Sequence, residues 1–217
     1  MDPIWEEIFR STEWGKYPPE YVIRFVATNF YAERKKREVR LLDLGCGVGA
    51  CTWYMSREGF RVSAIDGSPT AVSRAEDRLR SESLTAEFRT GDYKTLPWPD
   101  DFFDGALDNL SFICNVVEDW QRAVSEVFRV LKPGGVFLSA SFSPESWGYG
   151  LGRQIEPGTF TEIPEGPLKD RGQNHFVTEN ELRKFMSKFQ SVNIDRESRT
   201  LCNQQKVMNM WIATAKK

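Results

Sequence analysis

Apolar residues along this chain fall into two repeating patterns: short continuous runs, and longer stretches in which they recur every three or four positions. Short runs bounded by turn residues are typical of buried strands, and the longer period is typical of helices. The runs predict strands at 40–44, 60–65, 84–89, 135–142, 189–198 and 206–215, and the periodic stretches predict helices at 49–58, 68–82 and 119–131. This alternation indicates an α/β protein with a doubly wound, mostly parallel sheet.

Capping residues mark where individual helices begin. A proline pair precedes a helical period that starts at Glu20, and Ser68 followed by proline has the form of an N-cap with a first-turn proline. Thr178 followed three residues later by Glu181 is a capping box, which predicts a helix through about Lys188. Because Ser68 comes just after the second predicted strand, that strand ends at a rigid corner.

The most informative motif is the glycine-rich turn that follows the first predicted strand. Gly45 and Gly47 allow a tight turn that brings the main chain close to a ligand, and Gly49 begins a helix whose free N–H groups face the same ligand. Asp66 ends the next strand, about 20 residues after the glycines, where doubly wound sheets place an acceptor for ribose hydroxyls. The spacing predicts a nucleotide-cofactor site.

The glycines alone do not separate a nicotinamide dinucleotide from an adenosyl cofactor, because Gly45, Gly47 and Ala50 also fit the dinucleotide pattern. Asp43 lies two residues before the first glycine. A carboxylate there would repel a pyrophosphate but attract a ligand that carries an ammonium and a sulfonium. Since S-adenosylmethionine is such a ligand, Asp43 favours it.

Further stretches resemble the class I S-adenosylmethionine-dependent methyltransferase family, in particular its small-molecule, methyltransferase-11-like members, over roughly residues 39–217. Gly91-Asp92 stands where that family has an acid that meets the adenine amino group. Residues 102–109 are similar to its fourth strand, and 126–138 to its helix, Pro-Gly-Gly turn and fifth strand. The resemblance implies a Rossmann-like, seven-stranded, mostly parallel sheet with an antiparallel C-terminal edge hairpin and helices on both faces.

The same resemblance implies a cofactor site and an acceptor site. The cofactor is expected to be S-adenosylmethionine, with S-adenosylhomocysteine as product, bound by Asp43, Gly45, Cys46, Gly47, Gly49, Asp66, Gly67, Ser68, Gly91, Asp92, Tyr93, Asp108 and Asn109. The acceptor is expected to contact Trp14, Tyr17, Asn109, Phe112, Trp147 and His175.

His175 is the only histidine in the chain. It stands just before the predicted cap at Thr178, in a setting similar to the segment that leads from the substrate loop into the next helix of small-molecule methyltransferases. There a histidine can face the acceptor, so His175 is a candidate general base, with Asp108 as the second catalytic candidate. The alternative is a loop histidine that hydrogen-bonds the backbone near the cap.

Two segments lack regular periodicity and are candidate covers for the site. Residues 144–176 are rich in glycine and proline and exceed the ~12 to 15 residues usual for a loop, so we expect a substrate-selecting insertion over the carboxyl ends of the strands. Residues 11–17 carry aromatic side chains around a glycine and form a candidate flap. One domain is expected over 1–217, comprising an N-terminal helical and aromatic cap at 1–38, a cofactor-binding core at 39–143, the insertion at 144–176, and a C-terminal helix and hairpin at 177–217.

Composition narrows the class of partner. The 217 residues carry a net charge of −2, which gives no electrostatic footprint for nucleic acid or an anionic membrane, so the expected partner is a small-molecule acceptor and the expected state a monomer or homodimer. No apolar run approaches the ~20 residues of a membrane span, and the first residues are too acidic for a signal peptide, which predicts a cytoplasmic location. Four cysteines without C-x-x-C spacing and one histidine argue against a metal site.

These observations predict a metal-independent methyltransferase that acts on a small polar metabolite by O- or N-methylation, with a sugar or sugar conjugate as an example. C-methylation of a quinone-like ring is the second possibility, because 111–116 and 129–135 resemble quinone-ring C-methyltransferases. A third is a domain of this fold that binds without turnover, which the retained Asp43, Asp66 and Asp92 oppose. A nicotinamide-dependent oxidoreductase is opposed by Asp43 and by the missing Tyr-x-x-x-Lys constellation.

Overall fold

The computed structural model describes residues 2–33 and 35–217. Met1 and Arg34, which belong to the expected N-terminal cap, lie outside the described residues. Among the helices of the described residues, none has both the length and the apolar composition needed to cross a membrane.

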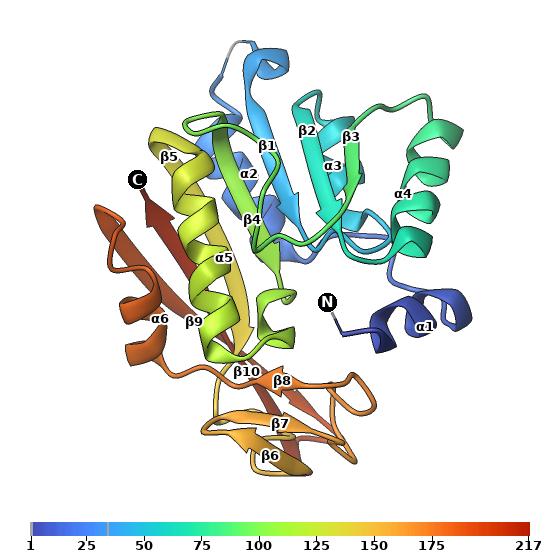
Figure 1. The fold of residues 1–217 in the computed structure, drawn as a ribbon, viewed down its shortest axis with the longest axis vertical. Coiled ribbons are helices and arrows are strands. Elements are labelled where there is room, and N and C mark those ends of the chain that lie inside the picture. The colour runs from blue at the N-terminus through green and yellow to red at the C-terminus, as the bar shows by residue number, and fades with distance from the viewer. Residues whose placement is uncertain (1, 34) are drawn as a thin grey trace.

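A seven-stranded sheet forms the centre of the molecule (Figure 1). In spatial order its strands are β3 (Glu87–Thr90), β2 (Arg61–Asp66), β1 (Arg40–Leu44), β4 (Phe103–Asn109), β5 (Leu131–Phe142), β10 (Lys206–Lys216) and β9 (Ser191–Leu201). The first five strands are parallel, and β10 pairs antiparallel with both β5 and β9. The predicted doubly wound sheet with an antiparallel C-terminal hairpin is therefore confirmed.

Helices cover both faces of this sheet, as predicted. The described helices are α1 (Ile4–Ser11), α2 (Glu20–Phe30), α3 (Ala50–Arg57), α4 (Pro69–Ser81), α5 (Val117–Val130) and α6 (Glu179–Phe185), with short 3₁₀ turns η1 (Lys36–Glu38) and η2 (Phe112–Cys114). Figure 1 shows α5 and α6 in front of the sheet and α2 and α3 behind it. Strands β1 and β2 are almost wholly buried, which explains why they appear in the sequence as short, mostly apolar runs.

The predicted helix starts agree with the observed caps. The Ser68 hydroxyl accepts from the Ala71 N–H at 3.0 Å, and Pro69 follows at the first helical position. Both halves of the capping box at Thr178 and Glu181 are formed, although α6 ends earlier than the sequence pattern indicated. Local hydrogen bonding thus determines where these two helices begin.

Two features differ from the sequence prediction. Helix α1 was not predicted, and the expected loop 144–176 contains a three-stranded sheet of β6 (Arg153–Glu156), β7 (Thr159–Thr161) and β8 (Asn174–His175). Strands of two to four residues are too short to show a period of two. The small sheet is instead stabilised by packing, because the buried rings of Phe160 and Phe176 contact each other with centroids 6.1 Å apart.

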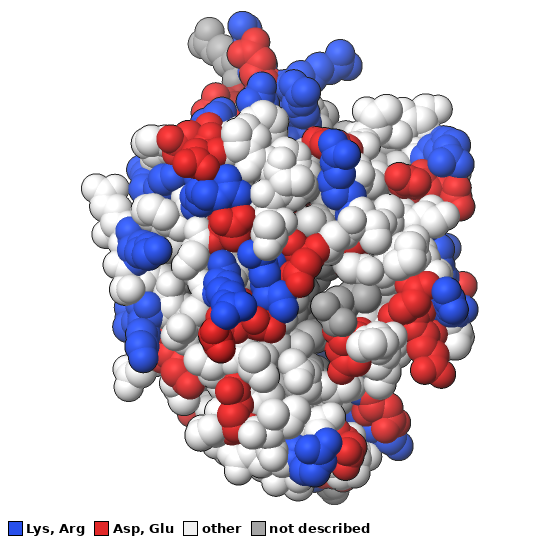
Figure 2. Space-filling model, viewed as in Figure 1, with Lys and Arg blue, Asp and Glu red and all other residues white. Residues whose placement is uncertain are grey.

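Charged side chains of both signs are interspersed over the face of the molecule seen in Figure 2. Acidic and basic groups lie next to one another on this face, without a broad region of one sign. This mixed distribution agrees with the small net charge of the chain, −2.

Candidate active site

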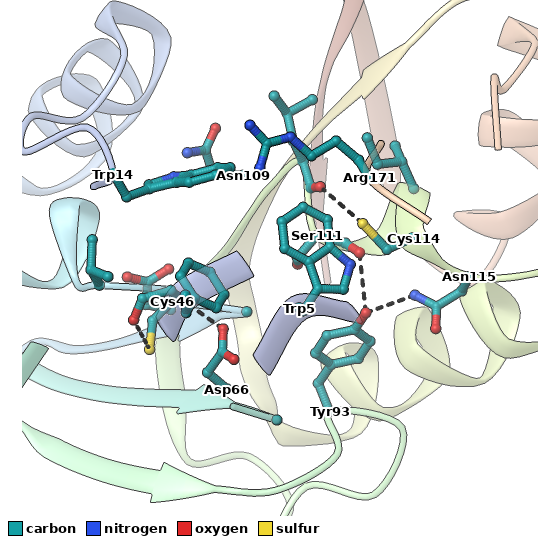
Figure 3. A pocket seen from close by; sticks show the side chains of 18 of the residues that line it. Trp5, Trp14, Cys46, Asp66, Tyr93, Asn109, Ser111, Cys114, Asn115 and Arg171 are labelled. Carbon is teal, nitrogen blue, oxygen red and sulfur yellow. Dashed lines mark hydrogen bonds between the residues drawn. The ribbon is translucent and has the colours of Figure 1, made fainter. Parts of the chain in front are cut away.

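A cavity of about 400 Å³ opens at the carboxyl ends of β1, β2 and β4, which is the size range of small-molecule sites. Its walls come from the glycine turn after β1, the residues that follow β2, β3 and β4, helix α1, and residues 167–174 (Figure 3). Figure 1 shows α1 and the small sheet just beyond this edge of the strands. The location agrees with the general rule that open α/β sheets bind ligands at this edge.

The glycine turn is shaped by close contacts that only glycine allows. Gly45 and Gly47 have left-handed φ values of +66° and +52°. A Cβ on Gly45 would lie 2.3 Å from Ser111 Cβ, so the loop after β4 can approach the turn only because this position lacks a side chain. A Cβ on Gly47 would meet the Phe9 ring at 3.3 Å, which shows that α1 lies directly over the turn.

Asp66 connects the glycine turn to the start of α4. Its two carboxylate oxygens accept hydrogen bonds from the Gly47 and Ser68 N–H groups, each at 2.8 Å. The side chain lines the cavity and is 5% exposed, and burial raises the pKa of its carboxyl. Each oxygen keeps a second lone pair, so the group can still accept from ligand hydroxyls.

Two more carboxylates line the same cavity. Asp43 is almost fully buried and accepts from the Thr52 hydroxyl at 2.6 Å, and burial raises the pKa of its carboxyl to about 7. Asp92 is more exposed and accepts from the Lys94 N–H at 2.9 Å. The structure therefore brings together the three aspartates that the sequence predicted.

Comparison with known proteins shows which family the core of the chain is similar to. Residues 42–139 match the model of the methyltransferase domain family. The chain is 38% identical over 104 residues to a demethylmenaquinone methyltransferase of Tropheryma whipplei and 36% identical over 109 residues to a ubiquinone/menaquinone biosynthesis C-methyltransferase of Vibrio vulnificus. Each match covers 48% of this chain and only 41% of the relative.

Solved structures extend the similarity to most of the chain. An S-adenosylmethionine-dependent methyltransferase of Methanosarcina mazei superposes with a TM-score of 0.67 at 26% identity, covering 82% of this chain and 92% of that one. The chain therefore has the fold of class I S-adenosylmethionine-dependent methyltransferases, and its core, residues 42–139, matches the methyltransferase domain family. A structure described for conversion of a disulfide into a thioacetal in echinomycin biosynthesis shares the fold at 21% identity, with a TM-score of 0.72 over 100% of this chain and 91% of that one.

Most of the cofactor residues predicted from the sequence line the cavity. They are Asp43, Gly45, Cys46, Gly47, Asp66, Gly67, Gly91, Asp92, Tyr93 and Asn109. Ser68 lies outside the cavity because its hydroxyl caps α4 and donates to Glu6. Gly49 also lies outside the cavity. A Cβ there would come 2.8 Å from Ala75 Cβ, so the absence of a side chain lets α3 pack on α4.

Asp108 does not line the cavity, contrary to expectation. It is fully buried and accepts four hydrogen bonds, from the Ser111 N–H and hydroxyl at 2.8 and 2.6 Å, the Phe112 N–H at 3.0 Å and the Ser139 hydroxyl at 2.8 Å. Burial raises the pKa of its carboxyl to about 6. The side chain shapes the loop that follows β4, and the next residue, Asn109, faces the cavity instead.

His175 is also outside the cavity, so the structure does not support its assignment as a base facing the acceptor. It pairs with Thr159 across β8 and β7, is fully buried, and its Nδ1 shares a 2.8 Å hydrogen bond with the Thr159 hydroxyl. The ring packs against Trp120 of α5, with centroids 5.8 Å apart. Its Nε2 has no hydrogen-bond partner in the described part of the chain, with Glu181 3.7 Å away, and burial lowers the pKa of the imidazole.

Only two of the predicted acceptor residues, Trp14 and Asn109, line the cavity. Tyr17 is 74% exposed and packs edge-on against Trp53. Phe112 is buried in the core, and Trp147 donates to Glu165 at 2.7 Å away from the cavity. The sequence predicted these aromatic residues from the segments in which they lie. The direction of each side chain depends on tertiary packing, which the sequence does not show.

Several residues that line the cavity were not identified from the sequence, among them Ser111 and Asn115, which hydrogen-bond with the predicted Tyr93. In Figure 3 the Tyr93 hydroxyl donates to the Ser111 carbonyl at 3.1 Å and accepts from the Asn115 amide at 2.7 Å. Burial raises the pKa of this phenol well above its ordinary value, so it stays protonated. The other unpredicted groups include Trp5 and Phe9 of α1, Cys51, Ile113, Cys114, Phe142, Pro167, Leu168, Arg171, Asn174 and Met208.

Helix α1 did leave a signal in the sequence. Ile4, Trp5, Ile8 and Phe9 are spaced as one face of a helix, and Trp5 and Phe9 pack with centroids 5.9 Å apart. Trp14 lies edge-on to both rings, at 6.0 and 5.6 Å. This aromatic cluster forms one wall of the cavity.

Proposed function

We propose that this chain transfers a methyl group from S-adenosylmethionine to a small-molecule acceptor held in the cavity. The observation that carries the proposal is the convergence of Asp43, Asp66 and the glycine turn on one cavity. Both carboxylates are largely buried, and burying charged groups without a ligand to bind is unfavourable. Their chemistry fits a ligand with cationic groups and hydroxyls.

In this proposal each polar group binds one part of the donor. Asp66 accepts the ribose hydroxyls through its remaining lone pairs, Asp43 attracts the ammonium and sulfonium, and Asp92 meets the adenine amino group. The rings of Trp5 and Phe9 supply the apolar cover over the adenosyl moiety. Around the glycine turn, the residues that the structure describes present no cluster of cationic side chains that would suit a pyrophosphate.

S-adenosylmethionine, when bound, supplies a methyl group that is already activated by the sulfonium. What remains for the chain is to orient an acceptor in line with that methyl and to exclude water. Helix α1 and residues 167–174 cover the cavity and serve the second purpose. Since His175 does not face the cavity, the proposal needs an acceptor whose attacking atom is activated by its own chemistry or by solvent.

For the acceptor we propose a small metabolite with a polar group and an apolar body, methylated at oxygen or nitrogen. The apolar walls formed by Phe142, Leu168 and Met208 favour the apolar body over a bare sugar. C-methylation of a quinone-like ring stays as the second candidate, because the similar proteins of Tropheryma and Vibrio carry names of that activity.

Transfer of tritium from labelled S-adenosylmethionine into the small molecules of a cell extract tests the proposal. We expect wild-type protein to label a small molecule, and Asp66→Ala to weaken S-adenosylhomocysteine binding by about 1–3 kcal/mol, or about 5- to 150-fold, because ligand hydroxyls lose their buried partner. Asp195→Ala, an exposed position on β9, is the matched control. Tight binding of NAD with no response to S-adenosylhomocysteine would contradict the assignment, and binding without any labelled product would indicate a domain without turnover.

A further inference from the structure

Arg171 is the one positive charge that the described residues contribute to the cavity wall. The other charged groups there are the three carboxylates Asp43, Asp66 and Asp92. Within the described chain no carboxylate pairs with the Arg171 guanidinium, whose side-chain contact is the Trp14 ring, 4.6 Å from Cζ to the ring centroid. In Figure 3 this side chain extends towards Trp14 and Asn109, on the side of the cavity away from Asp66 and Tyr93.

The turn that presents Arg171 is held by its neighbours. The Asn174 amide donates to the carbonyls of Arg171 and Gly172, each at 3.3 Å, and the Arg171 N–H donates to the Leu168 carbonyl at 3.3 Å. Gly172 has a φ of +69°, and a Cβ there would lie 2.5 Å from Asp2 Oδ2. The start of the chain thus packs on this turn, and the backbone under Arg171 has a defined position.

Trp14 supports the guanidinium from one face. The ring is held by its contacts with Trp5 and Phe9, and the preceding backbone is fixed by Arg74, which donates to the Thr12 carbonyl at 3.1 Å. A guanidinium stacked on an aromatic ring keeps its N–H groups in the plane of the fork, where they remain available. That fork matches the two oxygens of a carboxylate.

We propose that Arg171 binds a carboxylate of the methyl acceptor, so that the acceptors of this enzyme are carboxylic acids with an apolar body. The inference rests on the proposed function and adds the class of substrate. A partly buried cation without a counterion favours an anionic ligand, and a carboxylate placed near Asp43 or Asp66 would be repelled. Arg171 is therefore the position in the cavity where an acidic ligand is stabilised, and it comes from the same turn as the apolar wall residues Pro167 and Leu168.

The carboxylate of the donor itself is the competing partner, and donor analogues separate the two. Binding of S-adenosylhomocysteine is compared with that of 5′-methylthioadenosine, which lacks both the carboxylate and the ammonium. Arg171→Gln should leave both dissociation constants within about twofold of wild type. A tenfold or larger loss for S-adenosylhomocysteine alone would assign Arg171 to the donor and overturn the inference.

The acceptor is tested by fractionating a small-molecule extract on an anion exchanger before the labelling reaction. The fraction that receives tritium should be retained at pH 7 and released near pH 2, where carboxylates are neutral but phosphates and sulfates stay charged. Label in the unretained fraction, or in one still retained near pH 2, overturns the inference while leaving methyl transfer intact. Absence of label from every fraction, with S-adenosylhomocysteine still bound, contradicts the proposed function and the inference with it.

The labelled fraction then serves as substrate for variants. Arg171→Gln should raise KM for that fraction about tenfold or more with a smaller change in kcat, because a binding contact away from the reacting atoms is lost. Arg171→Lys should recover part of the loss, since it keeps the charge but not the fork. Arg153→Gln, an exposed arginine paired with Glu162 on the same segment, should behave as wild type. Unchanged KM in a folded Arg171→Gln protein overturns the inference.

Discussion

Asp43 illustrates how burial changes a carboxylate at the end of a strand. It is 1% exposed, and its pKa is raised to about 7 because desolvation outweighs the hydrogen bond from Thr52. Without a cationic ligand, a large fraction of this group is protonated near pH 7. A sulfonium or ammonium close by favours the ionised form, so ligand binding and proton release are coupled.

We therefore expect the affinity for S-adenosylmethionine to rise with pH between about 5.5 and 7.5, by up to about tenfold per pH unit below the pKa of Asp43. Binding at pH 6.5 should release a proton, which titration calorimetry detects as a heat that depends on the ionisation enthalpy of the buffer. Asp43→Asn should bind more weakly and lose both effects. A flat pH profile in wild-type protein would show that Asp43 does not sense the donor.

Burial shifts the pKa of His175 in the opposite direction to that of Asp43. Its pKa is lowered because burial penalises the imidazolium, so the unfolded chain takes up a proton at a higher pH than the folded one. The stability that neutral His175 contributes is present above pH 6.5, the unfolded value, and is lost as the pH falls below it. His175→Ala should lower the free energy of unfolding at pH 7.5 by about 2–4 kcal/mol, because a packed ring and the partner of Thr159 are removed.

The difference in the free energy of unfolding between wild type and His175→Gln, measured by urea unfolding, should shrink from pH 7.5 to pH 5. Turnover by the folded variant should stay within about threefold of wild type. Strong loss of turnover with unchanged stability would instead restore His175 as a catalytic base.

The different role that the sequence predicted for His175 has a simple cause. Being the only histidine marks a residue as notable, but strand pairing with Thr159 decides which way its ring points.

Asp108 and Asn109 show the same limit within two residues. The sequence identified the end of β4, but successive side chains of a strand point in opposite directions. Asp108 turns into the protein, where it meets Ser111 and Ser139, and Asn109 turns to the cavity. Both were reasonable candidates, and only the register of β4 in the sheet separates them.

At the scale of elements, α1 is attached to the cofactor core through α4. Glu6 accepts from the Thr70 hydroxyl at 2.6 Å and from the Ser68 hydroxyl, and Arg74 donates to the Phe9 carbonyl at 2.7 Å. The hydrogen bond from Ser68 is the main reason that the pKa of Glu6 is lowered to about 2, so this anchor is ionised at neutral pH. These contacts position Trp5 and Phe9 over the cavity.

Glu6→Ala should release α1, because the N-terminal residues of α4 lose their partner. Hydrogen exchange over residues 4–11 should become faster, and S-adenosylhomocysteine should bind several-fold more weakly since its apolar cover is lost. Glu7→Ala, the exposed neighbour on the same helix, is the matched control. Equal exchange in the two variants would show that α1 is held by its aromatic contacts alone.

The elements of the core could be predicted because their signals are local. The glycine turn, the Ser68 and Thr178 caps, and the apolar runs of β1 and β2 each lie within a few residues of sequence. The short strands of 153–175 could not be predicted in the same way. They exist because Thr159 and Phe160 pair with residues fifteen or so positions later, a contact that no local pattern records.

On the scale of the whole molecule, the cover of the cavity depends on contacts between distant parts of the chain. Asp2 packs on Gly172, and Arg171 stacks on Trp14, so the N-terminal segment and the insertion form one wall together. The sequence suggested two separate covers, and Trp14 from one and residues 167–174 from the other line the cavity. Their mutual contact required the three-dimensional structure, because it joins residues over 150 positions apart.

Because the cavity is bounded by the sheet, α1 and residues 167–174 together, a ligand that fills it should stabilise the entire fold. At a concentration 100 times its dissociation constant, S-adenosylhomocysteine should add about 2.7 kcal/mol to the free energy of unfolding. For a chain of 217 residues this corresponds to a rise in Tm of roughly 5–10 °C. NAD at the same concentration should leave Tm unchanged, because Asp43 repels its pyrophosphate. Differential scanning calorimetry measures Tm with either ligand. In Asp66→Ala, the Tm shift with S-adenosylhomocysteine should be much smaller at equal ligand concentration. A shift with NAD but not with S-adenosylhomocysteine would contradict the proposed donor.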